Sequence, residues 1–333
     1  MGPTYEPGSS PAPPASPSPL QQVFFNDFEL RAGWRFLIFY LTFEVVRRGV
    51  DLVAYLAAMV PSAQNQSSGL DPGPFIWSDG LGFVALLGLS AVAAAIEDRK
   101  PRHYGLPFKS AFRGNFWLGC LWGFVAISAL LLALRAGHNF YFGSFELNGW
   151  SFARFAAWWA IAFLLVSLYE EFYLRAYLQF TLTVGIGFWP AALFLSLLFA
   201  GMHWDNPGET SFGLCQIVLI GLFFCFTLWR TGTLWFAVGF HAAWDWGQSF
   251  FYGTPDSGLL ARGHLLHSSF AGSQWLTGGS VGPEGSILLT PLFVLLFVLF
   301  YLAFPTRVPY PDPEAIQPSA LDFGPPKAVN SGA

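Results

Sequence analysis

Charged residues are scarce in this chain. Asp, Glu, Lys and Arg make up only 11% of the 333 residues, whereas hydrophobic residues make up 54%. Soluble domains contain about 25% charged residues, so the deficit argues against an ordinary soluble domain and favours a membrane protein. The net charge is only −4, and no basic run is present. We therefore expect no nucleic-acid partner.

Cysteine is also rare. Cys120, Cys215 and Cys225 all lie in apolar runs without a Cys-x-x-Cys pair, which indicates small core residues rather than a disulfide framework. The N-terminus has neither the basic nor the apolar region of a cleaved signal peptide. Residues 1–22 and 309–333 are rich in Pro. We expect them to be disordered tails flanking one transmembrane domain at 23–308.

Long apolar runs dominate the rest of the chain. A bilayer crossing needs about 20 apolar residues in a helix, so the pattern predicts an all-α fold, a polytopic transmembrane helical bundle. The run at 188–203 is short for a crossing, and its ends are the least defined. About eight candidate spans are present, at 34–60, 81–96, 115–135, 155–180, 188–203, 213–230, 233–251 and 286–304.

Basic residues predict the orientation of the bundle. The loop 61–80 has no Lys or Arg, whereas the connection after the second span carries Arg99, Lys100, Arg102, Lys109 and Arg113. By the positive-inside rule this connection and both termini are cytoplasmic. We expect the membrane to be a prokaryotic inner or plasma membrane. The Gly- and Ser-rich stretch 253–285 then lies outside, and it is long enough for either a lid or a disordered loop.

Ionisable side chains inside spans cost about 2.5–3.5 kcal/mol each, so each needs a partner, a wet cavity or a function. In the fourth span, Glu171 and Arg175 are four residues apart and share a helix face. Glu170 lies about 100° around the helix from Glu171 and has no such partner. It is a candidate general base; a structural ion pair with an interfacial Glu170 is the alternative.

Two further spans carry histidines. His203 closes the fifth span, and His241 and Asp245 lie four apart on the seventh. A lone histidine is more often a core or interface residue, but a carboxylate one turn away orients an imidazole for function. The alternative is a self-satisfied His–Asp pair between helices.

A fourth charged group lies in the first span. The spacing predicts ion pairs between Glu44 and Arg48 and between Arg47 and Asp51. These charges neutralise one another, so we interpret them as structural, or as a sign that the helix lies partly in the membrane interface.

The patterns Glu-Glu-x-x-x-Arg, Phe-x-x-x-His and His-x-x-x-Asp occur in this order on separate apolar helices within 155–250. This arrangement resembles the CPBP family of intramembrane endopeptidases, which includes CAAX-prenyl-protease-like, bacteriocin-processing and Abi-type proteins. The resemblance implies a catalytic glutamate, its supporting pair, a second motif and a last histidine. The matching positions are, in that order, Glu170; Glu171 and Arg175; Phe199 and His203; and His241.

Asp245 departs from the family, which most often has Asn at this position. An amide can donate a hydrogen bond to an oxyanion, whereas an ionised carboxylate only accepts. Asp245 is therefore expected to be protonated, to orient His241, or to serve a cation.

The resemblance implies hydrolysis of membrane-associated or lipidated proteins or peptides, without a cofactor. Glu170 would take a proton from water and return it to the leaving amine, while His203 positions the water. His241 with Asp245 would bind the oxyanion. Simple depth counting places His203 near the outer end of its span, away from the other two motifs, so we expect an error in the bounds of that span and a site open toward the cytoplasm.

Three alternatives stay open. In a zinc-dependent version of the same hydrolase, Glu170, His203, His241 and Asp245 would supply ligands, although no His-Glu-x-x-His spacing is present. Intramembrane ionisable residues also serve transporters. A non-catalytic scaffold or immunity protein is the third. The oligomeric state and the natural substrate stay undefined.

Overall fold

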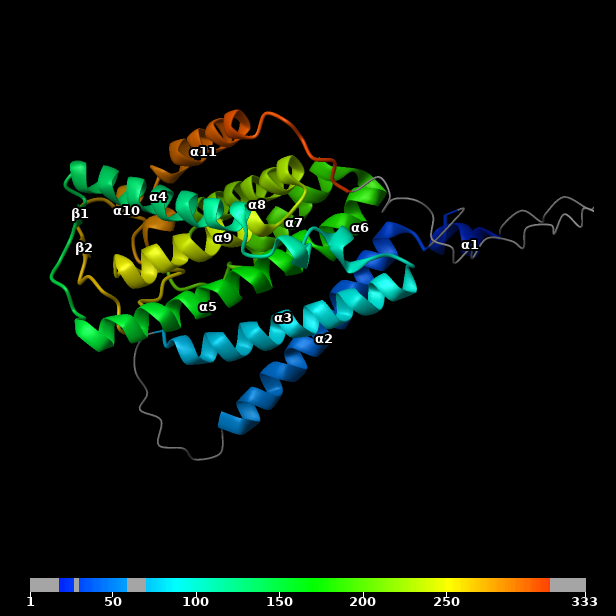
Figure 1. Ribbon diagram of the computed structural model, residues 1–333, viewed down its shortest axis with the longest axis horizontal. Coiled ribbons are helices and arrows are strands. Elements are labelled where there is room, and N and C mark those ends of the chain that lie inside the picture. The colour runs from blue at the N-terminus through cyan, green and yellow to red at the C-terminus, as the bar shows by residue number, and fades with distance from the viewer. Residues whose placement is uncertain (1–17, 27–29, 59–69, 312–333) are drawn as a thin grey trace, which may run out of the picture.

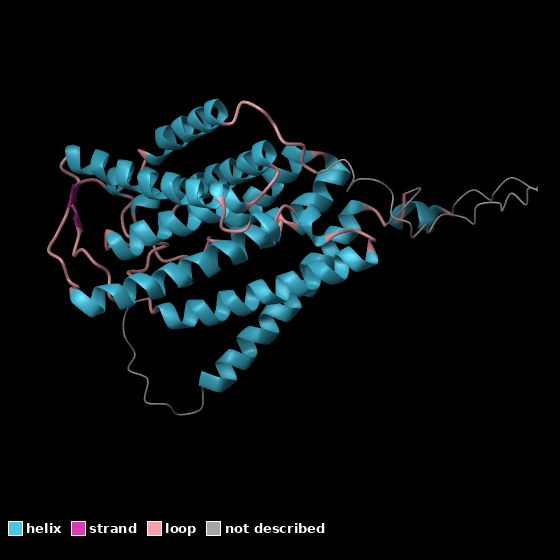
Figure 2. Cartoon of the chain, in the orientation of Figure 1, coloured by secondary structure: helices cyan, strands magenta, loops and turns pink. Residues whose placement is uncertain are grey.

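The computed structural model describes residues 18–26, 30–58 and 70–311. Helices form most of it (Figures 1 and 2). In chain order they are α1 (Pro19–Phe24), α2 (Ala32–Ala58), α3 (Pro72–Ile96), α4 (Gly114–Ala136), α5 (Gly149–Arg175), α6 (Tyr177–Ile186), α7 (Phe188–Met202), α8 (Ser211–Thr231), α9 (Trp235–Asp245), α10 (Gln274–Thr277) and α11 (Leu289–Ala303). Helices α3, α4, α5 and α8 run roughly along the long axis, whereas α2 crosses it obliquely (Figure 1).

Shorter elements connect these helices. The two strands β1 (Phe140–Tyr141) and β2 (Ser269–Phe270) pair antiparallel at the end of the bundle farthest from α1. The 3₁₀ turns are η1 (Pro101–Tyr104), η2 (Phe108–Ser110) and η4 (Pro283–Gly285), and α9 continues into a π-helical turn, η3 (Trp246–Phe251).

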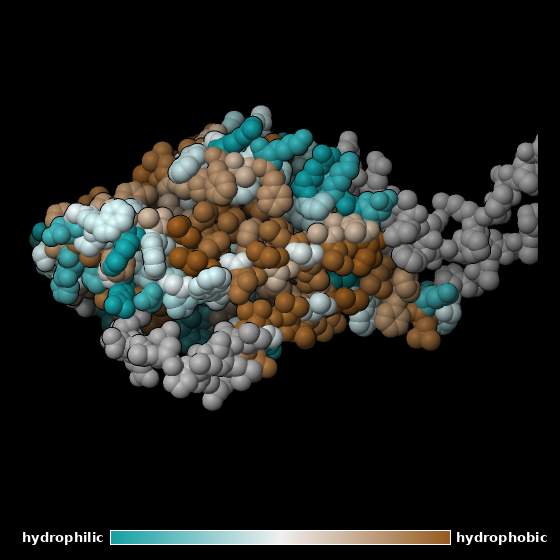
Figure 3. Space-filling view, turned by 60° about the horizontal axis from the view of Figure 1, so that its bottom comes forward, coloured by the Kyte–Doolittle hydropathy of each residue, from teal (hydrophilic) through white to brown (hydrophobic). Residues whose placement is uncertain are grey.

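The prediction of an all-α membrane bundle is confirmed. Among the described residues, four helical segments are long and apolar enough to cross a membrane, namely Pro72–Ile96, Gly114–Ala136, Gly149–Ile186 and Ser211–Thr231. Hydrophobic side chains cover the middle of the face seen in Figure 3, and hydrophilic ones gather toward its left end. Exposed apolar side chains on long helices are what a lipid-facing surface requires, so the protein is integral to the membrane.

Local chemistry moves some helix ends away from their predicted positions. The side chain of Asp71 accepts a hydrogen bond from the backbone N–H of Gly73, and Pro72 occupies the first turn. Both features favour helix initiation. Consequently α3 begins at Pro72, well before the expected 81, and the glycines that follow do not interrupt it.

The fourth predicted span, 155–180, is not one continuous helix. Ala176 has φ −91° and ψ −105°, outside the helical region, and it separates α5 from α6. Gly187, with φ 87°, then ends α6 and lets the chain reverse into α7. A left-handed φ of this kind favours glycine because a Cβ would clash.

The last residues of the predicted N-terminal tail are helical. Residues 19–22 belong to α1, which Ser18 caps by accepting a hydrogen bond from the backbone N–H of Gln21. The Gln21 side chain in turn accepts from the backbone of Ser18, so a capping box stabilises the turn. The remaining parts of both predicted tails, 1–17 and 312–333, lie outside the described residues.

Helices α4 and α9 pack with their backbones in contact. A Cβ added at Gly123 would overlap the carbonyl oxygen of Phe240, and one added at Gly239 would overlap that of Phe116. Gly119, one turn before Gly123, is equally close to α9. Small residues four apart allow this approach in membrane helices. The contact positions α9, which carries His241 and Asp245.

Glu44 of the first span is paired differently from the prediction. Glu44 accepts from Arg47 at 2.8 Å, rather than from Arg48, and also from the hydroxyl of Tyr173 at 2.8 Å. The side chain of Asp51 lies outside the described part of the structure. Because Tyr173 is on α5, this network connects α2 to the helix that bears Glu170 and Glu171.

The stretch 253–285 is folded onto the bundle. The backbone N–H of Leu70 donates to Leu260, and that of Arg262 donates back to Leu70. Trp159 of α5 donates from its indole to the carbonyl of Arg262 at 2.9 Å. These bonds hold the segment against the N-terminal ends of α3 and α5, where it closes one end of the molecule.

Candidate active site

The hairpin formed by α5, α6 and α7 places two of the predicted motifs at the same depth. Glu171 precedes Gly187 by 16 residues, and His203 follows Gly187 by 16. Helix α7 has only 15 residues, about 22 Å at 1.5 Å per residue. His203, its C-cap, therefore lies within the bundle near the level of Glu171. The placement of His203 near the outer surface was wrong because α7 is too short to cross.

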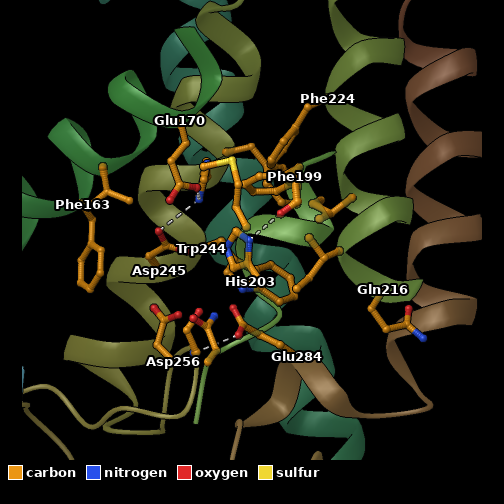
Figure 4. A pocket seen from close by; sticks show the side chains of 18 of the residues that line it. Phe163, Glu170, Phe199, His203, Gln216, Phe224, Trp244, Asp245, Asp256 and Glu284 are labelled. Atoms are coloured by element: carbon orange, nitrogen blue, oxygen red, sulfur yellow. Dashed lines mark hydrogen bonds and ion pairs between the residues drawn. The ribbon is translucent and has the colours of Figure 1, made fainter. Parts of the chain in front are cut away.

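Four of the six predicted residues line one cavity of about 330 Å³. Glu170 of α5, His203 of α7, and His241 and Asp245 of α9 all line it (Figure 4). The remaining two predicted residues, Glu171 and Arg175, do not line the cavity but are buried next to residues that do. Three motifs far apart in the sequence thus meet in one place.

Glu171 connects the first motif to the last. Its Oε1 lies 3.2 Å from Nη1 of Arg175 and 3.1 Å from Nδ1 of His241, and the side chains of Glu171 and Arg175 are fully buried. A buried carboxylate can interact favourably with a ring nitrogen only if that nitrogen donates a proton. The contact therefore places a proton on Nδ1 and fixes the ring orientation, a role that the sequence had suggested for Asp245.

Arg175 lies between aromatic rings. Its guanidinium is 4.5 Å from the ring centroid of Phe199 and 5.8 Å from that of Phe224, distances typical of cation–π contacts. A Cβ at Gly221 would come within 2.9 Å of Nη2 of Arg175. Glycine at this position therefore provides the space that the buried guanidinium occupies.

Phe199 also holds His203. Its carbonyl oxygen lies 2.8 Å from Nδ1 of His203, and the two rings meet edge to face at 4.6 Å. Because a carbonyl only accepts, Nδ1 of His203 must donate. In the neutral ring this leaves Nε2 as an acceptor. In the motif Phe-x-x-x-His, the ring of Phe199 thus packs on Arg175. The carbonyl oxygen of Phe199 sets the tautomer of His203.

The second nitrogen of His241 faces two more carboxylates. Nε2 lies 3.7 Å from Oε2 of Glu170 and 3.4 Å from Oδ2 of Asp245. Both distances exceed an ordinary hydrogen bond, so these groups are close but not locked together. Catalytic contacts are often this loose before substrate binds. Asp245 is nearly buried, and its nearest charged partner is His241.

Sequence reasoning missed two carboxylates of the cavity. Asp256 and Glu284 line it from the stretch 253–285, and Figure 4 shows them on the side opposite Glu170. Burial raises the pKa of both, and the negative charge of Asp256 adds to the rise in the pKa of Glu284. The only signal was acidic residues in a segment rich in Gly and Ser, which does not reveal what they face.

The cavity extends toward one end of the bundle. Besides Asp256 and Glu284, Leu70 and Leu259 line it. These residues belong to connections at the start of α3, whereas the basic connection 97–113 follows the end of α3. The folded stretch 253–285 therefore lines the cavity at the end of the bundle opposite the basic connection, and the side of the membrane on which the site opens stays a prediction.

A metal shell does not form from these side chains. Within 18–26, 30–58 and 70–311, no three His, Cys, Asp or Glu residues converge as metal ligands. The ligands suggested for zinc, Glu170, His203, His241 and Asp245, share a cavity but do not form such a group.

Comparison with known proteins agrees with the geometry. No curated protein matches the chain. Residues 152–247, which include all three motifs, match the family model described as type II CAAX prenyl endopeptidase Rce1-like. The resemblance expected from the motifs is confirmed for this segment, which is similar to the Rce1-like type II CAAX prenyl endopeptidases.

Proposed function

We propose that this protein is an intramembrane endopeptidase that hydrolyses peptide bonds of membrane-associated or lipidated proteins or peptides. One observation carries the proposal. Glu170, His203, His241 and Asp245 line one cavity between largely apolar helices, and buried Glu171 orients His241. Ionisable side chains cost free energy within a membrane, so several of them around one cavity indicate catalysis rather than packing.

Glu170 is the proposed general base. It lines the cavity and its carboxylate makes no hydrogen bond to Arg175, which is paired with Glu171. A free carboxylate can take a proton from water and return it to the leaving amine. His203, whose Nδ1 is engaged by Phe199, offers Nε2 as an acceptor that positions the same water.

His241 is the proposed donor to the tetrahedral oxyanion. With Nδ1 held by Glu171, a ring that carries both protons directs Nε2–H into the cavity. Donors aimed at a developing oxyanion contribute about 2.7–4 kcal/mol of transition-state stabilisation each. Asp245, 3.4 Å from Nε2, balances the charge of the doubly protonated ring.

Replacing the base tests the proposal. We expect Glu170→Gln to lower the rate of cleavage of a membrane-anchored peptide about 10²–10⁴-fold, because the amide cannot accept the proton. Mass spectrometry of the products in lipid nanodiscs measures cleavage. Glu146→Gln, at a half-exposed carboxylate that does not line the cavity, is the matched control and should retain activity.

Unaltered cleavage by Glu170→Gln would exclude Glu170 as the base. If no cleavage occurs with either protein but the biological effect survives the substitution, a scaffold or immunity role replaces the peptidase. Proton or ion flux through liposomes that depends on Glu170 would instead support a transporter.

A chelator separates the two versions of the hydrolase. We expect the rate of peptide cleavage to remain within about twofold of the untreated rate after prolonged dialysis against a strong zinc chelator, because the described carboxylates and imidazoles do not converge as ligands. Metal content of the dialysed protein is measured in parallel. Loss of activity that added zinc restores would establish the zinc-dependent alternative.

A further inference from the structure

Two carboxylates of the cavity have no part in the proposed chemistry. Asp256 accepts a hydrogen bond from the hydroxyl of Ser249 at 2.7 Å, and Glu284 accepts one from the backbone N–H of Ser257 at 3.1 Å. In the described part of the chain, neither carboxylate has a Lys or Arg partner, and no Lys or Arg lines the cavity. Two half-buried carboxyl groups thus share one side of the cavity without a Lys or Arg among its lining residues.

An unsatisfied amide lies on the same cavity. Gln216 of α8 is 2% exposed, and its Nε2 donates to the hydroxyl of Thr290 at 2.7 Å. Its Oε1 is buried and has no hydrogen-bond partner. Leaving a buried acceptor unpaired costs about 1–3 kcal/mol.

Apolar side chains complete this part of the cavity. Ile217 and Ile220 of α8 and Leu289 and Phe293 of α11 line it, and η4, which carries Glu284, packs against both helices. An apolar surface beside carboxylates matches the stem and the charged head of a long basic side chain, whose methylene groups pack on apolar surface while the head remains in polar surroundings.

We propose that Asp256 and Glu284 bind a Lys or Arg side chain of the substrate, so that the enzyme prefers apolar peptides with a basic residue near the cleaved bond. The proposal rests on the proposed peptidase function and names its substrate class. A peptide with an acidic residue at that position would bring like charges together and be rejected. A basic side chain fits better than a divalent cation, because the described carboxylates do not converge as metal ligands.

Binding to a protein that does not cleave tests this proposal independently of catalysis. The full chain, carrying Glu170→Gln, is placed in nanodiscs of uncharged lipid, so that the bilayer does not attract the peptide. Fluorescence anisotropy then measures the Kd of apolar peptides that differ at one position, which is arginine, citrulline or glutamate. We expect the arginine peptide to bind about tenfold tighter than its neutral citrulline isostere, and the glutamate peptide to bind more weakly than either.

Removing the carboxylates should remove the preference. In the combined variant Asp256→Asn and Glu284→Gln, we expect the Kd values for arginine and citrulline to lie within about twofold of each other. Binding of the citrulline peptide should be unchanged, which shows that the cavity is intact. Glu146→Gln, on a neighbouring connection and paired with His267, should keep the tenfold preference.

Three results would overturn the inference. The first is equal binding of all three peptides by the protein with both carboxylates intact, which requires no variant to fold. The second is an arginine preference that survives the double substitution. The third is calorimetric binding of Ca²⁺ or Mg²⁺ that needs both carboxylates and abolishes the preference, since the wall would then be a cation site. None of these depends on cleavage, which the Glu170 experiment judges separately.

Discussion

At the residue scale, Glu171 connects groups that the sequence places on different helices. Its carboxylate contacts Arg175 and His241, while Oε2 has no hydrogen-bond partner. A buried ion pair contributes little net stability, but leaving one of its charges unpaired is costly. The pair is therefore better explained by orientation of His241 than by stabilisation of the bundle.

This explanation predicts a difference between single and double substitutions. We expect Glu171→Gln to lower the free energy of unfolding by about 3–5 kcal/mol, because the Arg175 guanidinium stays buried without its anion. Glu171→Leu combined with Arg175→Met should recover much of that loss. Both proteins should cleave slowly, because His241 loses the carboxylate that accepts from Nδ1 and stabilises the doubly protonated ring. Thermal unfolding and cleavage rates in the same detergent measure the two effects. Full activity in the double variant would contradict an orienting role for Glu171.

At the element scale, the position of α9 depends on contact with α4. The two helices approach so closely that residues with a side chain cannot replace Gly123 or Gly239 without movement. Because His241 lies two residues after Gly239, a displacement of α9 moves the imidazole relative to Glu170. Helix packing and site geometry are therefore coupled.

Replacing Gly239 by valine tests whether the packing of α9 on α4 controls the geometry of the site. We expect Gly239→Val to lower the free energy of unfolding by about 1–3 kcal/mol through overpacking, and to lower the cleavage rate more than stability alone explains. Gly88→Val on α3 is the matched control, since nothing lies within 4 Å of a Cβ there, and both changes alter helix propensity equally. Thermal unfolding and peptide cleavage are compared. Equal behaviour of the two variants would separate α9 packing from catalysis.

At the scale of the whole molecule, the closure of one end by 253–285 makes stability depend on pH. Burial raises the pKa of Asp256 and Glu284 in the folded protein. The groups facing them from other elements include Glu170, Asp245, His203 and His241 around the same cavity. A raised carboxyl pKa means that the folded state holds these protons more tightly than the unfolded state.

The sign of the effect follows from this difference. The contribution is fully present below the ordinary carboxyl pKa of about 4 and is lost as the pH rises through the raised pKa of the folded state. We expect Asp256→Asn with Glu284→Gln to raise the melting temperature at neutral pH, and the gain to shrink as the pH falls. Melting curves across a pH series measure it, with Glu146→Gln as control. A gain that does not vary with pH would contradict this origin.

Much of the fold could be predicted because lipid imposes strong rules. Apolar runs must become helices when no water is available to the backbone, and charges within such runs need partners. Glu171 and Arg175 pair as their spacing indicated, and the His241–Asp245 pair faces the cavity as expected. Helix ends were harder to predict, since a cap such as Asp71 or a break such as Ala176 depends on a few local atoms.

The sequence by itself determined the long apolar runs, and hence the membrane bundle. It also determined which ionisable side chains lie within those runs, and hence the candidate residues. Only the tertiary structure decided that Glu171 holds His241, that short α7 brings His203 to the depth of Glu170, and that Asp256 and Glu284 complete the cavity. The physical reason is range. Helical periodicity and the cost of charge in lipid act over a few neighbouring residues, whereas the cavity forms where helices and a loop distant in sequence pack together.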